Sequence, residues 1–386
     1  MLDPYPCHLA KSGRLMLRKN HKNYEIKKLA ILAKQNINSR LKLQRTKDLS
    51  FQDKHYLALV LLISLFCAFA EGTSNAANWF GRLPKGDSLL DQVQKLEDKN
   101  IREQFRKLFE WQFKNIFHFR PLKPKVIVAI DTTDKPTYSR KKKENKNIVG
   151  GKPKASTFYF FRFASIQIAD RRNPITLYVM HCNKDTTNEQ IVEELVLQAR
   201  KIIRIKCVLI DRGFYDTKVF NKLEQLGVKY IMPCKSDDKT EKMFENHLSS
   251  NYEVQPYFCQ NKKKEYADFR LIMIRLEDGK EIGYVTNMHF IKLHRAKYYT
   301  ELYQKRWNIE TGYRLQNMFL AKTCSIHSSV RLFYFCYAVA LHNLWIMIKS
   351  KIQSNIFNVP VFLFVFVLLI TVIAEFLDVS LLMKVT

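Results

Sequence analysis

The sequence lacks the cysteine patterns that indicate a zinc site or a redox-active pair. Its eight cysteines are scattered, mostly in apolar runs, with no CxxC pair and no cysteine–histidine spacing of the zinc type. A signal peptide is also not visible, because the N-terminal stretch is basic and polar. We therefore expect reduced core cysteines in a cytoplasmic protein.

Acidic residues are scarce relative to basic ones. The chain has 36 Asp and Glu against 64 Lys and Arg, a formal net charge of +28. This excess is larger than solubility requires, and its sign attracts phosphate backbones or anionic membranes. Nucleic acid is the partner that this composition favours.

The sequence offers one stretch as a candidate membrane span, and that stretch is short. The most apolar stretch, residues 359–374, contains one polar residue, Thr371. It is shorter than the roughly 20 residues that a spanning helix needs. A buried terminal helix, or strand-like packing of the tail, is favoured over a membrane span.

The 386 residues predict two or three domains, since single cores stop growing near about 250–300 residues. Residues 1–120 read as an all-helical basic domain. Apolar residues at helical spacing predict helices over 24–37, 53–70, 74–79, 89–96 and 101–116. A helix-turn-helix that binds DNA and a helical scaffold for the next domain both remain open, because no turn signature marks a recognition helix.

After Pro121 and Pro124 the pattern changes to α/β. Buried or alternating strands are predicted over 126–130, 157–168, 175–180, 207–210 and 228–232, with helices over 187–202 and 217–226. A basic loop, 140–154, follows the first strand. Residues 235–290 predict a β-rich insertion with a hairpin turn at Asp278-Gly279, and helices follow over 296–319 and 330–349.

Three acidic residues stand at positions suited to phosphoryl transfer. Asp131 and Asp211 each end a predicted buried strand, and Glu310 lies on a later helix. Mg²⁺ prefers oxygen ligands, and two ions about 3.5–4 Å apart need a shared carboxylate. Alone, a strand-terminal Asp is more often a turn former or helix cap, and a charged helix is often only solvated. The ordered set of three favours a metal site.

The later helix carries cations around its glutamate. At 3.6 residues per turn, one face of this helix collects five polar or aromatic side chains. They are Tyr303, Arg306, Glu310, Arg314 and Asn317.

These motifs resemble the DDE transposases of bacterial and archaeal insertion sequences. The matching text is Val128-Ala129-Ile130-Asp131-Thr132-Thr133-Asp134, then Asp211-Arg212-Gly213-Phe214-Tyr215, then the Tyr-x2-Arg-x3-Glu signature at Tyr303, Arg306 and Glu310. The resemblance covers about residues 50–350. It implies that Asp131, Asp211 and Glu310 are catalytic and bind two Mg²⁺ ions, for which Mn²⁺ can substitute.

The same resemblance implies a domain organisation. A ribonuclease H-like catalytic core would comprise residues 121–234 and 291–350, interrupted by the β-rich insertion at 235–290. An all-helical DNA-binding domain, 1–120, would precede it, and an apolar tail, 351–386, would follow.

The sequence departs from the family pattern at two places. The commonest signature has a lysine seven residues after the glutamate, where this chain has Asn317. Arg314, one turn after Glu310, resembles an archaeal branch, and a guanidinium can bind phosphate oxygens bidentately. The insertion also has no tryptophan, so the resemblance does not imply a hairpin intermediate.

The resemblance further implies double-stranded DNA as partner, both transposon ends and target, with a homodimer on paired ends, nucleoid association and no obligate protein partner. Arg306 and Arg314 would hold phosphate, and Tyr303 would contact the DNA backbone or simply pack. Lys141, Lys142 and Lys143 would grip flanking DNA. The alternatives are a non-catalytic or cleavage-only remnant of a mobile element, a nuclease of the same fold and, from another class, a membrane-associated basic protein.

Overall fold

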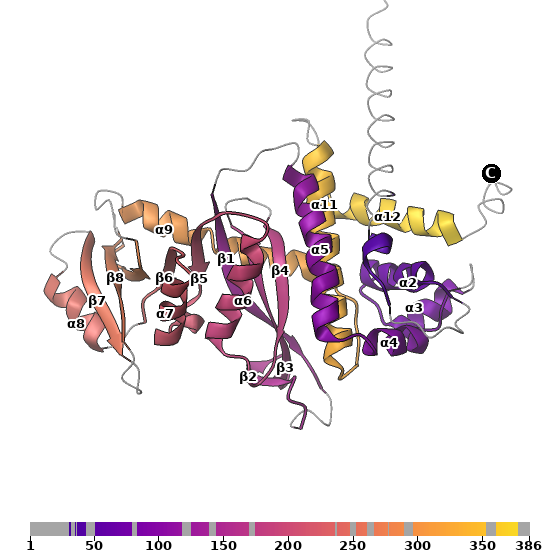
Figure 1. The fold of residues 1–386 in the computed structure, drawn as a ribbon, viewed down its shortest axis with the longest axis horizontal. Coiled ribbons are helices and arrows are strands. Elements are labelled where there is room, and N and C mark those ends of the chain that lie inside the picture. Colours follow the sequence, from indigo (N-terminus) through magenta and orange to yellow (C-terminus); the bar gives the residue numbers. More distant parts are fainter. Residues whose placement is uncertain are drawn as a thin grey trace, which may run out of the picture. The chain divides into compact units, whose positions relative to one another are not determined.

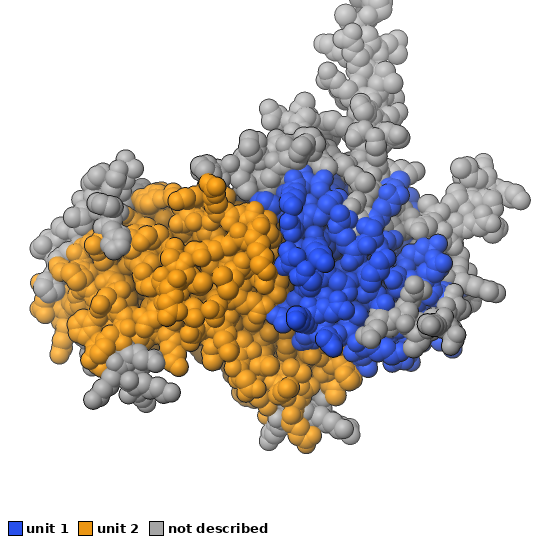
Figure 2. Space-filling view, viewed as in Figure 1, with its two compact units in different colours: residues 1–120, 318–323, 333–386 blue, residues 121–317, 324–332 orange. Residues whose placement is uncertain are grey.

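The structure is a computed structural model that describes residues 37–43, 51–78, 83–117, 125–138, 144–169, 174–235, 238–247, 252–260, 266–276, 278–288, 296–352 and 360–376, with Ile31 and Gln35. The chain divides into two compact units (Figure 2). Unit 1 comprises residues 1–120, 318–323 and 333–386, and unit 2 comprises 121–317 and 324–332. The expected domain of 1–120 is thus joined by segments from the end of the chain.

Unit 1 is helical in its described residues (Figure 1). Its helices are α2 (Asp53–Leu65), α3 (Ala70–Ala77), α4 (Gly86–Gln94), α5 (Asp98–Phe117), most of α11 (Ser328–Ile352) and α12 (Val361–Phe376). The sequence predicts a helix start at Ser74. Ser74 lies inside α3 instead, and its hydroxyl donates to the Pro84 carbonyl at 2.7 Å. The predicted helix 24–37 lies largely outside the described residues.

Helix α11 explains why residues 333–350 group with the helices rather than with the predicted core. The side-chain amide of Gln112 on α5 donates to the Ala340 carbonyl at 2.8 Å, and the rings of Phe105 and Phe333 meet edge to face at 5.3 Å. The segment Ser328–Ser350 is long and apolar enough to cross a membrane, and 94% of its most apolar stretch is buried in the fold. Such burial is typical of a core helix.

The apolar tail forms helix α12, one of its two expected conformations. Phe364, Leu368 and Val372 are buried at four-residue spacing, and Phe319 meets Phe364 edge to face at 5.9 Å. Phe362 is 79% exposed on the opposite side. The helix is therefore buried along one stripe.

Unit 2 is built on one mixed sheet of nine strands (Figure 1). The strands are β1 (Val126–Pro136), β2 (Val149–Lys154), β3 (Thr157–Ile168), β4 (Ile175–Cys182), β5 (Ile205–Ile210), β6 (Tyr230–Pro233), β7 (Tyr252–Gln260), β8 (Tyr266–Arg275) and β9 (Glu281–Thr286). Their order is β2-β3-β1-β5-β6-β9-β8-β7, and β4 also pairs with β3. The parallel neighbours β1, β5 and β6 form its centre.

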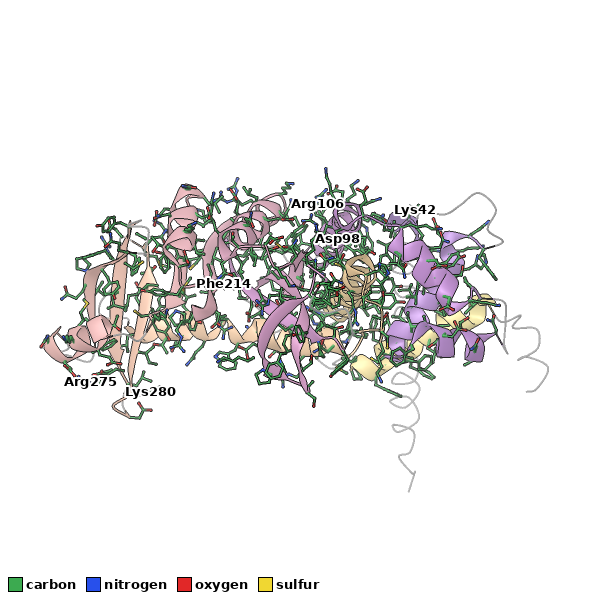
Figure 3. All side chains as sticks on the ribbon, turned by 90° about the horizontal axis from the view of Figure 1, so that it is seen from below. Lys42, Asp98, Arg106, Phe214, Arg275 and Lys280 are labelled. Carbon is green, nitrogen blue, oxygen red and sulfur yellow. The ribbon has the colours of Figure 1, made fainter. Side chains whose placement is uncertain are left out.

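Helices flank this sheet on both faces. They are α6 (Asn188–Arg200), α7 (Thr217–Gln225), α8 (Asp238–His247), α9 (Ala296–Gln304) and α10 (Trp307–Asn317), with a short 3-10 turn, η1 (Arg212–Phe214). Helices α6 and α7 cover one face, whereas α9 and α10 run along the other (Figures 1 and 3). The predicted capping box of α6 is present, with Thr187 accepting from the Gln190 amide.

The β-rich insertion is part of the main sheet. Strand β9 pairs antiparallel with β6, and β8 and β7 follow outward. Arg275 and Lys280 mark the hairpin between β8 and β9, and Gly279 takes the positive φ of 77° that the predicted turn requires (Figure 3). Helix α8, which the sequence did not predict, precedes these strands.

Candidate active site

Asp131 and Asp211 meet where two parallel strands separate. The pairing of β1 with β5 ends at Ile130↔Ile210, and the residue that follows each partner is an aspartate. The sequence predicts that the first strand ends at Asp131. The structure continues β1 to Pro136, now paired only with β3. Because β5 stops at Ile210, the Asp131 side chain lies at an open edge next to Asp211.

The Asp131 carboxylate is oriented and largely desolvated. Its Oδ1 accepts from the backbone N–H of Thr132 at 2.7 Å, and its side chain is 16% exposed. Burial raises the pKa of Asp131 to about 6, and the negative charges of Asp211 and Glu310 add to this rise. The Thr132 amide and the Arg306 guanidinium oppose it. Asp131 thus belongs to a cluster with excess negative charge.

Asp211 is fixed by the turn that follows it. The backbone N–H of Phe214 donates to the Asp211 carbonyl at 3.0 Å and closes η1. Phe214, labelled in Figure 3, is 3% exposed and anchors this turn in the core. The Asp211 side chain itself remains 44% exposed. A carboxylate held by its backbone and open to solvent can receive a ligand without refolding.

The helix that carries Glu310 begins later than predicted. The sequence predicts one helix over 296–319, but α9 ends at Gln304 and α10 begins at Trp307. Arg306 lies in the break between the two helices, where its backbone N–H donates to the Tyr303 carbonyl at 2.8 Å. Glu310 follows in the first turn of α10, where the helix dipole favours a carboxylate.

The Arg306 guanidinium joins the three carboxylates. Nη1 lies 3.2 Å from Asp131 Oδ2, and Nη2 lies 2.9 Å from Glu310 Oε1 and 3.7 Å from Asp211 Oδ1. The Arg306 side chain is only 9% exposed. Three carboxylates that lie far apart along the chain therefore converge on one buried cation. The predicted triad residues are brought together.

The other predicted contact residues have different fates. Tyr303 packs: its ring lies 5.1 Å from that of Tyr284 and under the Arg306 guanidinium at 5.7 Å. Arg314 is exposed on α10, with Nη2 3.5 Å from the Thr311 hydroxyl. Lys141, Lys142 and Lys143 lie outside the described residues.

Asp134 is separate from the carboxylate cluster. It lies on β1 opposite Arg162 of β3, and its two carboxylate oxygens accept from Arg162 at 2.7 and 2.9 Å. Successive residues of a strand point to opposite faces. Three residues after Asp131, Asp134 therefore faces away from it and engages a different arginine.

Helix α10 is locked to the sheet by residues that sequence reasoning missed. The Tyr313 hydroxyl donates to the Asp131 carbonyl at 2.8 Å and lies 2.8 Å from the Ser165 hydroxyl of β3. Asn308 donates to the Ala169 carbonyl at 2.9 Å. The sequence feature that could have identified Tyr313 is its position three residues after Glu310, on the same face of the helix.

Gly312 permits the close approach of α10 to β3. A Cβ at this position would overlap the side-chain amide oxygen of Gln167 and lie 3.0 Å from Cγ of Pro174. We expect Gly312→Ala to lower the free energy of unfolding by roughly 1–3 kcal/mol, as overpacking does. Differential scanning calorimetry would measure this loss. Thr311→Ala, at the neighbouring half-buried position, is the matched control, and equal stability of the two variants would contradict the tight contact.

The donor set suits a hard divalent cation. Carboxylate oxygens are the ligands that Mg²⁺ prefers, and the cluster carries three carboxylates against one guanidinium. Among the described residues, no three His, Cys, Asp or Glu side chains lie close enough to one another to hold one metal ion as they stand. Here the Arg306 guanidinium takes up the space between Asp131, Asp211 and Glu310. An ion and this guanidinium would share the same oxygens.

Comparison with known proteins gives one sequence family and one fold. The family model described as Transposase DDE domain matches residues 122–343. No curated protein sequence matches the chain. Among solved structures, a cryo-EM structure of the piggyBac transposase synaptic complex with hairpin DNA is similar at a TM-score of 0.51 and 14% identity, over 89% of this chain and 77% of that chain. The likeness shows the fold: N-terminal helices and a mixed sheet that resembles a ribonuclease H-like transposase core.

Proposed function

The chain belongs to the transposase DDE domain family, and on that premise we propose that it cuts DNA at the ends of an insertion sequence and joins them to target DNA. Membership in this family implies DNA phosphoryl transfer. The observation that supports the proposal is the convergence of Asp131, Asp211 and Glu310 on one buried guanidinium. A solvated charged surface would not gather three carboxylates from a strand, a turn and a helix.

In this proposal Asp131, Asp211 and Glu310 hold the divalent cations. When bound, such ions activate water or a 3′-hydroxyl and stabilise the leaving oxygen of the phosphodiester. The protein fixes the carboxylates: Thr132 orients Asp131, η1 holds Asp211, and Tyr313 docks the helix of Glu310. Catalysis then rests on positioning and neutralisation of charge, which is what phosphoryl transfer requires.

DNA is the substrate that this charge distribution supports. The net charge of +28 favours a polyanion, and Arg314 is exposed one turn from Glu310. A guanidinium there can donate two parallel hydrogen bonds to a phosphate. The similar piggyBac structure is a synaptic complex with hairpin DNA. Two ends held together require at least two active sites, so we include a homodimer on paired ends in the proposal.

The experiment uses the DNA that flanks the coding sequence in its genome. Purified protein is incubated with end-labelled flanking DNA and a supercoiled target, with Mg²⁺, Mn²⁺ or EDTA. Metal-dependent cleavage at short inverted repeats, followed by joining to the target, is expected. Cleavage without joined product would restrict the function to a nuclease of the same fold, and absence of both with Mg²⁺ and Mn²⁺ would contradict the proposal.

The pH dependence of cleavage should report Asp131. Because its pKa is raised to about 6, the folded protein holds this proton more tightly than the unfolded chain between about pH 4 and 6. The contribution of Asp131 to the free energy of unfolding is therefore present below that window and is lost as pH rises through it. A protonated Asp131 is a poor cation ligand, so cleavage at limiting Mg²⁺ should fall about tenfold per pH unit below 6.

Rate profiles from pH 4.5 to 8 at limiting and saturating Mg²⁺ would measure this effect. Saturating Mg²⁺ competes with the proton, and the midpoint should move to lower pH. A midpoint that is the same at both concentrations would contradict the role of Asp131 as a ligand.

A further inference from the structure

A basic strip leads away from the three carboxylates toward the end of β1. It consists of Lys135 on β1, Lys154 at the end of β2 and Arg314 on α10. In a strand, residues two apart share a face, so Lys135 projects from the same side of β1 as Asp131. Asp134, between them, projects to the other side and pairs with Arg162.

The strip is continuous from one element to the next. The Lys135 ammonium donates to the side-chain carbonyl of Asn317 at 2.5 Å. Asn317 follows Arg314 by three residues and Glu310 by seven, so the three share one face of α10. Lys154 pairs with Thr157 of β3, whose hydroxyl donates to the carbonyl of Thr137, two residues after Lys135. From there the positive charge of Lys154 lowers the pKa of the Lys135 ammonium. Cations thus lie on β2, β1 and α10, with β3 between the two strands.

Positive charge predominates along this strip. Asn317 is a neutral acceptor, so its hydrogen bond does not cancel the positive charge of the Lys135 ammonium. Burial, then the charge of Lys154, lowers the pKa of Lys135 to about 8, while Asp134 opposes this shift. Asp134 is itself paired with Arg162 at 2.7 Å. An anion that approaches the strip would therefore stabilise a half-buried lysine between two further cations.

The spacing fits a DNA strand. Four residues of β1 separate Lys135 from Asp131 by about 13 Å, at about 3.3 Å per residue. Seven residues of α10 separate Asn317 from Glu310 by about 10 Å, at about 1.5 Å per residue. One strand of duplex DNA has a phosphate about every 3.4 Å along the axis, and the phosphates lie further apart than this along the strand itself. The ammonium therefore lies within a few nucleotides of the carboxylates.

We infer that the strip of Lys135, Lys154 and Arg314 binds the phosphodiester backbone of the DNA strand that enters the carboxylate site, with Lys135 on a phosphate within a few nucleotides of the cleaved bond. This inference rests on the proposed function for the identity of the anion. It adds two lysines from two strands to the substrate contacts, and it gives Asn317 the role of positioning the Lys135 ammonium.

Binding is measured without cleavage, so that the strip and the reaction are tested separately. Fluorescence anisotropy gives the affinity of the full chain for a labelled end duplex in EDTA, between about 50 and 200 mM salt. Removal of one lysine–phosphate ion pair reduces the slope of log affinity against log salt by about 0.9. Lys135→Met and Lys154→Met should each show this reduction, and Lys135→Arg should show none.

Lys280→Met is the matched control, because Lys280 is an exposed lysine on the hairpin between β8 and β9, several strands away from β1 (Figure 3). Its slope should equal that of the wild type. The position is tested by a series of duplexes that each carry one neutral methylphosphonate, placed at successive nucleotides next to the cleaved bond. One of these duplexes should weaken wild-type binding and leave the affinity of Lys135→Met unchanged.

The inference is contradicted if Lys135→Met and Lys154→Met both keep the wild-type slope. If Lys135→Met does not fold, by circular dichroism, Lys154→Met and the methylphosphonate series on wild-type protein decide the question. Wild-type protein that does not bind the end duplex would contradict the strip and the proposed function together. The expected reductions in slope, found without any metal-dependent cleavage, would support the strip and remove only the catalytic proposal.

Discussion

Asp131→Asn is expected to abolish metal-dependent DNA cleavage while DNA binding is retained. The substitution keeps the size of the side chain and removes one of the three charges that contact Arg306. Metal ions provide several kcal/mol of transition-state stabilisation, and each ~1.4 kcal/mol is tenfold in rate. The loss should therefore be on the order of 10³-fold or more, measured as single-turnover cleavage of an end duplex.

Asp134→Asn is the matched control for this prediction. It lies on the same strand three residues later, but it pairs with Arg162 at 2.7 Å and faces away from the cluster. Its cleavage rate should stay within a few-fold of wild type. Loss of cleavage in Asp134→Asn, with retention in Asp131→Asn, would show that the wrong aspartate of the first motif has been assigned.

Arg306→Gln is expected to have the second large effect, on stability and on the response to Mg²⁺. The guanidinium is 9% exposed and contacts three carboxylates. Removing one partner of a buried ion pair costs roughly 3–5 kcal/mol. Asp211 and Glu310 are 44% and 40% exposed, so solvent screens part of their repulsion and the low end of this range applies.

Mg²⁺ should raise the melting temperature of Arg306→Gln more than that of the wild type. In the wild type an ion competes with the guanidinium for the same oxygens, whereas in the variant it finds them unpaired. Differential scanning fluorimetry over a Mg²⁺ titration would measure the two shifts. Arg162→Gln, which removes the arginine that pairs with Asp134, should lower stability without changing the Mg²⁺ response. An equal or smaller shift in Arg306→Gln would contradict competition at one site.

The elements of unit 2 could largely be predicted from the sequence. Continuous apolar runs predicted β5 and the first half of β1, two strand-like runs separated by a turn predicted β3 and β4, and the Thr187–Gln190 box predicted α6. These signals depend on local burial and capping, which a short window of sequence contains. The meeting of Asp131 and Asp211 also followed, because two parallel strands ended at them.

Features that depend on tertiary pairing could not be predicted. Thr132-Thr133-Asp134-Lys135 is polar and reads as a loop, but β3 pairs with it and extends β1 to Pro136. The break before Trp307 had no Gly or Pro to mark it, and it places Arg306 among the carboxylates instead of on a continuous helix face. Both corrections concern the site, and both bring in cations: Arg306 and Lys135.

The grouping of the last helices with the N-terminal helices also could not be predicted from local sequence. Helix α11 was predicted over 330–349 and is observed over Ser328–Ile352, yet nothing in its own sequence says that it packs on α5. That choice depends on long-range partners such as Phe105 and Gln112, which lie more than 200 residues earlier in the chain.

The central claim is tested most directly by measuring whether Asp211 and Glu310 act as one unit. The measurement is the single-turnover cleavage rate of Asp211→Asn, Glu310→Gln and the double variant, on one end duplex with Mg²⁺. Residues that hold the same cations are strongly non-additive, so the double variant should be no slower than the slower single variant. Losses that multiply in the double variant, or wild-type cleavage by Glu310→Gln, would contradict a single carboxylate site.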